Sequence, residues 1–429
     1  MSDSLSGSRS RSVLRRVAWL LLVCALLVAA LPGDTFQGKA YARLAIDQAI
    51  GDRGYGFLAW GAATFRQKIA DTVEQPEARL TPSARHDLVV SYFDAIGQAD
   101  ALQGRIDLLN SEPHESGVAM AAAATLQYQL DRLREQQAGR RPAVERILQE
   151  QVTSLIAQNG LTTAGRVWPP VLFHFTDTPD VLIVSPRDRI FLEYSAYMQP
   201  GATDAAMDAT EDLVAQRLGV SVLIDGTGGF STWPTMILAL DDMPWVLSTI
   251  SHEWFHTYMA FHPLGWHYFD NADTRTLNET AADIFGDDLG AQVLAEYYPE
   301  KVPRPPQAPG PAGQASRGAT PAPFSFDDTM HTTRLKVDAL LAQGKIAEAE
   351  AYMEAQRQVI VSHGYALRKL NQAYFAFHGS YAEGPAATDP IGPKLRALRA
   401  HSGSLRRFVQ LVSQVTSVAD LDRALASLP

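Results

Sequence analysis

"SHEWFHTYMAFH" (residues 251–262) places three histidines and a glutamate within twelve positions. His252 and His256 are four residues apart, so on an α-helix they lie on one face, one turn from each other. Two imidazoles in this arrangement are able to bind one metal ion. Glu253 lies about 100° further round the helix, within reach of a water on that ion. The spacing therefore predicts a helix with two metal ligands and a general base.

A catalytic zinc site has three protein ligands, and the sequence offers two candidates for the third. His262 stands six residues after His256, where some proteases place their third histidine, but those chains need a glycine at the position of Met259. Met259 favours a helix that continues and carries His262 to the far side. The better candidate is Glu279, in a second helix predicted over residues 276–298.

Two neighbours of Glu279 have the residue types that support ligand histidines. Asp283 follows Glu279 by four residues and shares its helix face. It would accept the free ring N–H of one ligand histidine and so fix its tautomer. Asn278 would hold the other histidine ring or the loop.

Together, His252-Glu253-x-x-His256 and Asn278-Glu279-x-x-x-Asp283 resemble the motif of the gluzincin metallopeptidases, of which thermolysin is an example. The resemblance covers residues 167–300. It implies Zn²⁺ held by the two histidines and Glu279, with Glu253 as general base for peptide-bond hydrolysis. It also implies a small sheet before the first helix, with an edge strand that binds the substrate backbone. The stretch "STWPTMILAL" (residues 231–240) stands where that strand is expected.

Gluzincins also supply a tyrosine or histidine, downstream of the third ligand, that stabilises the oxyanion. The stretch "LNQAYFAFHGSYA" (residues 370–382) offers Tyr374, His378 and Tyr381. Tyr374 and His378 are four residues apart and share a helix face, so they are the candidate catalytic donors. Each also fits the role of a core aromatic residue or a helix end.

Two functions follow from these residues. The first is a zinc metallopeptidase that acts on a peptide or protein substrate. The second is a scaffold or binding protein that holds a metal on a peptidase-like fold without hydrolysis, because fold and motif do not guarantee activity. Glu253 favours the first function, since a scaffold has no need of a base beside the water.

The first 42 residues predict an export signal or a membrane anchor. Arginines at positions 9, 11, 15 and 16 precede an apolar run over residues 17–31. This run would span only about 22 Å as a helix, which suits a signal peptide, while a slightly longer helix would form a transmembrane anchor. Both alternatives remain open. Either one places the rest of the chain at the extracytoplasmic face of the cell membrane or in the secreted fraction, with membrane association through this segment.

The composition excludes one class of partner. The formal net charge is −10 and the pI is near 5.6, so the chain lacks the basic face that nucleic-acid binding requires. The only cysteine, Cys24, lies inside the apolar run, so no disulfide is expected downstream. The oligomeric state stays open.

The hydrophobic pattern predicts a mostly helical α+β fold with a small mixed sheet before the HExxH helix. We expect an N-terminal helical region (43–165), a zincin-like catalytic core (166–300), a Pro-rich linker (301–325) and a C-terminal helical region (326–429). Short β-branched and aromatic runs predict the strands of the core. They are residues 171–175, 180–186, 190–198, 221–226 and 231–240, with a helix over residues 203–219.

Overall fold

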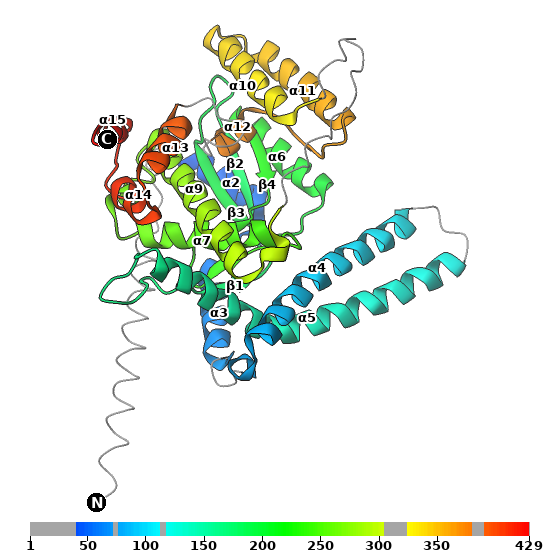
Figure 1. Cartoon of the computed structure of the whole chain (residues 1–429). Helices are drawn as coiled ribbons and strands as arrows, with labels where there is room; N and C mark the ends of the chain where they lie inside the picture. The colour runs from blue at the N-terminus through cyan, green and yellow to red at the C-terminus, as the bar shows by residue number, and fades with distance from the viewer. Residues whose placement is uncertain (1–39, 72–75, 112–116, 304–323, 380–389, 429) are drawn as a thin grey trace, which may run out of the picture. The chain divides into compact units, whose positions relative to one another are not determined.

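The computed structural model describes residues 40–71, 76–111, 117–303, 324–379 and 390–428 (Figure 1). The apolar run at residues 17–31, Tyr381 and nearly all of the expected Pro-rich linker lie outside the described residues. The chain divides into two units, residues 1–49 and 50–429. The described part of the first unit lies in helix α2 (Ala40–Ile50). All features below belong to the second unit.

The second unit is mostly helical, which confirms the predicted fold class. Its N-terminal half contains the 3-10 turn η1 (Gly51–Arg53), α3 (Phe57–Asp71), the 3-10 turn η2 (Pro76–Arg79), α4 (Pro82–Ser111), α5 (Gly117–Gln158) and α6 (Asp204–Leu218). Then come α7 (Met243–Met259), α8 (Pro263–Trp266), α9 (Ala272–Tyr297) and the 3-10 turn η3 (Pro299–Lys301). The C-terminal helices are α10 (Phe326–Ala342), α11 (Ile346–Ser362), α12 (Gln372–His378), α13 (Ile391–His401), α14 (Leu405–Val412) and α15 (Val418–Ala426).

The strands form two small sheets that precede α7 in the chain. The first has the order β1-β6-β5 and consists of β1 (Phe173–Phe175), β5 (Gly229–Phe230) and β6 (Thr235–Ile237). It is mixed, because β1 runs parallel to β6 and β5 runs antiparallel. The second is antiparallel with the order β3-β2-β4 and consists of β2 (Asp180–Ser185), β3 (Tyr194–Met198) and β4 (Ser221–Asp225).

The mixed sheet agrees with the expectation, but its edge strand differs from the one proposed from the sequence. Residues 231–240 supply β6, which is paired on both sides and therefore has no free edge. The two edge strands are β1 and β5, and β5 is only two residues long. Such a short strand shows no alternation in the sequence, so periodicity gave no sign of it.

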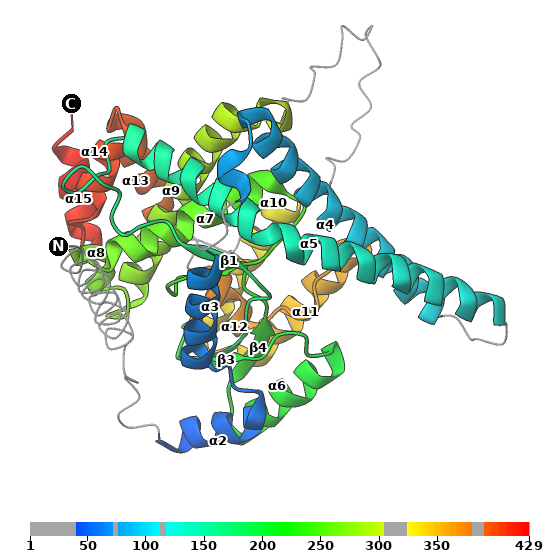
Figure 2. The same ribbon diagram turned by 90° about the horizontal axis from the view of Figure 1, so that it is seen from below.

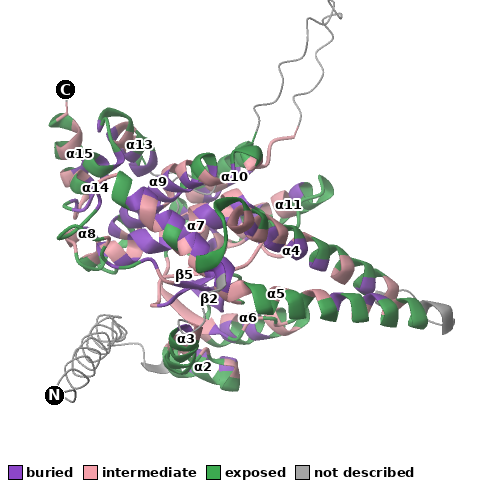
Figure 3. Ribbon diagram, turned by 60° about the horizontal axis from the view of Figure 1, so that its bottom comes forward, coloured by how far each residue is buried: buried purple, intermediate pink, exposed green. Residues whose placement is uncertain are grey.

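One hydrophobic core runs through regions that the sequence suggested as separate. Buried residues of α4, α5, β1, α7, α9 and the last three helices form a single cluster that includes Phe93, Ile147, Phe173, Phe255 and Leu395. Figure 1 shows α4 and α5 as a long antiparallel pair, and Figure 3 shows buried residues along α7 and α9. The metal-motif helices therefore lie at the centre of the packing.

The expected transmembrane helix requires correction. Among the helices in the described part of the chain, none combines the length and the apolar character needed to cross a membrane. The expectation was based on residues 17–31, which lie outside the described residues.

Candidate metal centre

Helix α7 carries His252, Glu253 and His256, and its first turn explains where it begins. Asp242 is the N-cap, and its carboxylate accepts a hydrogen bond of 3.0 Å from the backbone N–H of Trp245. Pro244 occupies the first turn, where a missing N–H costs nothing. This start sets the phase of the helix and hence the direction of the three functional side chains.

Helix α9 approaches α7 closely because two glycines of α9 face α7. A Cβ atom on Gly286 would lie 2.8 Å from the carbonyl oxygen of Ser248 and 3.0 Å from Cβ of His252. A Cβ atom on Gly290 would lie 2.7 Å from the backbone nitrogen of Ser248. Contacts this short exclude any side chain at either position. The two helix axes therefore come close enough for side chains of α9 to reach the histidines of α7.

The close approach brings three ligand atoms together. Nε2 of His252 lies 2.9 Å from Nε2 of His256. Oε2 of Glu279 lies 3.6 Å from the first nitrogen and 3.4 Å from the second. His252, His256 and Glu279 thus form a group that could hold a metal ion, with all three ligand atoms within 4.8 Å of one another.

Both histidine rings are held from behind by the residues expected from the sequence. Nδ1 of His252 lies 3.0 Å from Oδ1 of Asp283, and Nδ1 of His256 lies 2.8 Å from Oδ1 of Asn278. The amide of Asn278 also donates to the carbonyl of Leu264, at 3.3 Å. With a metal ion bound, the proton of each ring would lie on Nδ1, and both Nε2 atoms would be free to bind the ion beside Oε2 of Glu279. This donor set fits a metal ion that prefers nitrogen and oxygen ligands.

Tyr268 completes the surroundings of Glu279, and sequence reasoning did not identify it. Its hydroxyl donates to Oε1 of Glu279, which leaves Oε2 directed at the histidines. Burial alone would raise the pKa of Glu279, but His256 and His252 outweigh burial and hold this pKa well below its usual value. Glu279 is therefore a carboxylate in the folded protein. Tyr268 lies in the loop between α8 and α9. This loop has no hydrophobic periodicity from which the position of Tyr268 could be predicted.

Glu253 points from α7 toward the edge strand β5. Its carboxylate accepts a hydrogen bond from the hydroxyl of Ser231. A Cβ atom on Gly229 would lie only 2.6 Å from Oε1 of Glu253, so β5 passes directly over this carboxylate. Glu253 is thus oriented by the strand and buried between the strand and the helix.

His262 lies apart from the three ligands, although the reason differs from the one expected. Helix α7 does not continue past Met259 but ends there. His262 becomes the N-cap residue of α8, with its Nδ1 2.9 Å from the carbonyl of Tyr258 and its ring stacked on the Tyr258 ring. The tight return depends on Gly265, because a Cβ atom there would collide with the carbonyl of Met259.

Tyr374 and His378 lie on α12, which packs on the antiparallel sheet. Nε2 of His378 is 2.8 Å from Oδ2 of Asp225, and the ring of His378 contacts that of Tyr374, with centroids 4.3 Å apart. Burial and the charge of Asp225 raise the pKa of Tyr374 to about 12. Among the described residues, the polar and ring contacts of these two side chains do not include the three possible metal ligands. The two residues share one helix face, as expected from the sequence, but the polar partner of His378 is Asp225 at the end of β4.

Tyr197 of β3 lies closer to the charges of the site. Val181 of β2 pairs with Tyr197 on one side and with Asp225 on the other, so the three side chains share one face of the sheet. Tyr197 and Asp225 are thus two strand spacings apart, about 10 Å. Burial, followed by the charge of Glu279, raises the pKa of Tyr197 to about 12, and Glu253 contributes in the same direction. The phenol near these two carboxylates therefore stays protonated at neutral pH.

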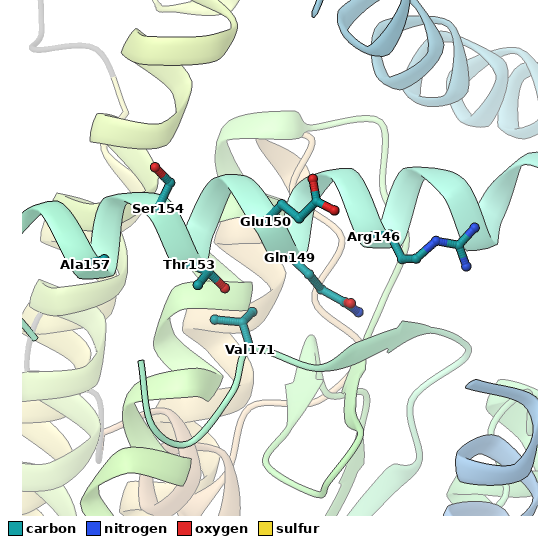
Figure 4. A pocket seen from close by; sticks show the side chains of 7 residues that line it. All are labelled: Arg146, Gln149, Glu150, Thr153, Ser154, Ala157 and Val171. Atoms are coloured by element: carbon teal, nitrogen blue, oxygen red, sulfur yellow. The ribbon is translucent and has the colours of Figure 1, made fainter. Parts of the chain in front are cut away.

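A hollow of about 420 Å³ lies along α5 and is separate from the metal ligands (Figure 4). It is lined by Arg146, Gln149, Glu150, Thr153, Ser154, Ala157 and Val171. Its principal polar groups already have structural partners: Arg146 binds Glu77, Glu150 binds Arg85 and Gln149 donates to the carbonyl of Phe173. The group that could hold a metal ion lies on α7 and α9 instead.

Comparison with known proteins gives no match: no family model, no curated protein and no solved structure is similar to this chain at a significant level.

Proposed function

We propose that this protein is a zinc-dependent metallopeptidase. The observation that carries the proposal is the convergence of His252, His256 and Glu279, together with a buried glutamate one residue along from the first histidine. Two histidines and one glutamate are a ligand set used by catalytic zinc sites. The resemblance of the HExxH and NExxxD motifs to those of gluzincins supports the same function.

In the proposed reaction, His252, His256 and Glu279 would hold the zinc ion. Zinc in such a site lowers the pKa of a bound water and polarises a substrate carbonyl. Glu253 accepts a proton from the attacking water while the new C–O bond forms. Glu253 then gives this proton to the leaving nitrogen as the C–N bond breaks, which yields a carboxylic acid and an amine. Ser231 keeps the Glu253 carboxylate in place through its hydrogen bond.

Two further groups have roles in this proposal. The edge strand β5 lies over Glu253, and an extended peptide would pair with its side opposite to β6. Tyr197 is the proposed donor to the oxyanion, in place of Tyr374 or His378, because its ring contacts Phe230, whose chain neighbours Gly229 and Ser231 lie against Glu253. The order of basic and apolar residues near the N-terminus supports action outside the cytoplasm.

The test compares the full chain with its Glu253→Gln variant. Each protein is loaded with zinc, its metal content is measured, and it is incubated with a mixed peptide library whose products are identified by mass spectrometry. We expect both proteins to retain zinc and only the wild type to cleave. Glu296→Gln, at an exposed position of α9, is the matched control and should cleave normally. Zinc binding without cleavage by the wild type would reject the peptidase and favour a metal-binding scaffold.

A further inference from the structure

Three aromatic side chains from distant parts of the chain form a cluster beside the proposed site. Phe57 begins α3, Tyr197 lies on β3 and Phe230 lies on β5. The rings of Phe57 and Phe230 are stacked with centroids 4.7 Å apart. Tyr197 contacts both rings edge-on, at 4.8 Å from Phe230 and 5.3 Å from Phe57. All three residues are half-buried. We call this group the aromatic wall.

The aromatic wall adjoins the proposed general base. Both chain neighbours of Phe230 contact Glu253: Gly229 lies against its carboxylate and Ser231 donates to it. Side chains alternate along a strand, so the ring of Phe230 lies on the face of β5 opposite to α7. On that face it meets the ring of Tyr197. The aromatic wall therefore begins next to Glu253 and continues away from the three possible metal ligands.

The backbone holds the third ring in position. The N–H of Tyr55 donates to the carbonyl of Tyr197 at 3.0 Å, and the N–H of Gln199 donates to the carbonyl of Arg53 at 2.7 Å. Gly54 thereby pairs with Met198 as an additional antiparallel bridge on the outer edge of β3. Figure 2 shows the start of α3 near β3. Because this pairing fixes Phe57, the wall is formed before any substrate binds.

We propose that Phe57, Tyr197 and Phe230 form a subsite for one aromatic or large aliphatic side chain of the substrate, next to the bond that is cleaved. This inference rests on the proposed peptidase function. Half-buried aromatic residues suit a further aromatic side chain, because aromatic rings prefer stacked or edge-on contacts. Acidic side chains are disfavoured, because the apolar rings of Phe57 and Phe230 leave a carboxylate without hydrogen-bond partners.

The decisive experiment measures binding rather than turnover. The zinc-loaded full chain with Glu253→Gln is titrated with three peptides that differ at one position, which is Phe, Ala or Glu. The peptide set is repeated with that position moved along the chain. We expect Phe to bind about tenfold more tightly than Ala at one position, and Glu to bind more weakly still. Adding Phe230→Ala or Phe57→Ala should reduce the preference for Phe to about twofold or less.

Leu58→Ala is the matched control, because Leu58 adjoins Phe57 but is 67% exposed. It should leave the preference for Phe unchanged. Phe230→Leu, with a smaller loss of volume, replaces Phe230→Ala if thermal unfolding shows that the alanine variant does not fold. Equal binding of all three peptides, or a preference that survives loss of either phenylalanine, would overturn the subsite. Wild-type cleavage of the peptides that lack Phe would then still support the peptidase, so the two proposals fail separately.

Discussion

Gly286 leaves no room for a side chain beside Ser248: a Cβ atom at residue 286 would lie 2.8 Å from the Ser248 carbonyl oxygen. The same atom would lie 3.0 Å from Cβ of His252, one of the possible metal ligands. Both obstacles are backbone or the root of a side chain, which do not move aside easily. The distance between α7 and α9, and with it the geometry of the ligands, depends on this glycine.

Gly286→Ala should weaken metal binding although it removes no ligand. The added methyl group pushes α9 away from α7, so we expect a loss of at least about tenfold in zinc affinity and about 1–3 kcal/mol in the free energy of unfolding. Chelator competition and urea unfolding measure the two effects. Gly139→Ala, in α5 with no atom within 4 Å, is the control and should stabilise the protein by up to about 1 kcal/mol. Similar behaviour of both variants would show that the helices are not held by this contact.

Tyr268→Phe should lower the affinity for zinc because Glu279 loses the hydroxyl that orients it. Loss of such supporting hydrogen bonds commonly costs about 10–100-fold in metal affinity. The dissociation constant from competition with a fluorescent zinc chelator provides the measurement. Tyr128→Phe, at a position that is 66% exposed, should leave the constant unchanged. An unaltered constant for Tyr268→Phe would mean that the helices alone orient the carboxylate.

Tyr197→Phe should reduce kcat for peptide hydrolysis by about 10²–10³-fold, the usual loss when an oxyanion donor is removed. The metal content should stay the same, since Tyr197 is not one of the possible ligands. The ring remains, so KM should change little. Steady-state kinetics of Tyr374→Phe and His378→Ala provide the comparison. If either of these variants lost more kcat than Tyr197→Phe, the oxyanion donor would be on α12 rather than on β3.

Lys68→Met should destabilise the protein strongly. The Lys68 ammonium binds the carboxylate of Glu145, which is completely buried and also faces His174. Removal of the lysine leaves a buried charge with less compensation, which typically costs about 3–5 kcal/mol. Urea unfolding checks this value. Lys301→Met removes a surface pair with Asp94 and should cost less than about 1 kcal/mol. Comparable losses would argue against the buried pair as a stabilising contact.

Glu77→Gln should change how stability depends on pH. Burial would raise the pKa of Glu77, but the hydrogen bonds from Arg146 outweigh burial and lower this pKa below its ordinary value. The stabilisation is therefore present above the ordinary glutamate pKa and is lost as pH falls through the lower folded-state value. Unfolding free energies measured from neutral pH down to about pH 3 should differ most at neutral pH and then converge. Glu296→Gln should follow the wild type throughout.

The sequence was sufficient where the geometry is local. Four-residue spacing placed His252 and His256 on one face, and the same rule placed Asp283 beside Glu279. The supporting contacts of Asp283 and Asn278 then agree with the expected pairing. A regular helix has a fixed number of residues per turn, so residue spacing alone was enough to predict which of these side chains share a helix face.

Other features depend on contacts between distant segments, which spacing does not encode. Tyr268 reaches Glu279 from a loop without periodicity, and Tyr197 belongs to a strand whose position beside the site is set by sheet pairing. Helix α7 ends at Met259 because the chain turns back around Gly265, not because of the residue at the end. Such positions are determined by packing, which outweighs local preference.

The pairing of Arg53 and Tyr55 with β3 has a practical consequence. A fragment that starts at residue 166 would leave the outer N–H and C=O groups of β3 without partners. Open strand edges attract other chains, so such a trimmed fragment should self-associate and precipitate during purification. Production of a well-behaved sample for crystallisation therefore requires a starting point before residue 50.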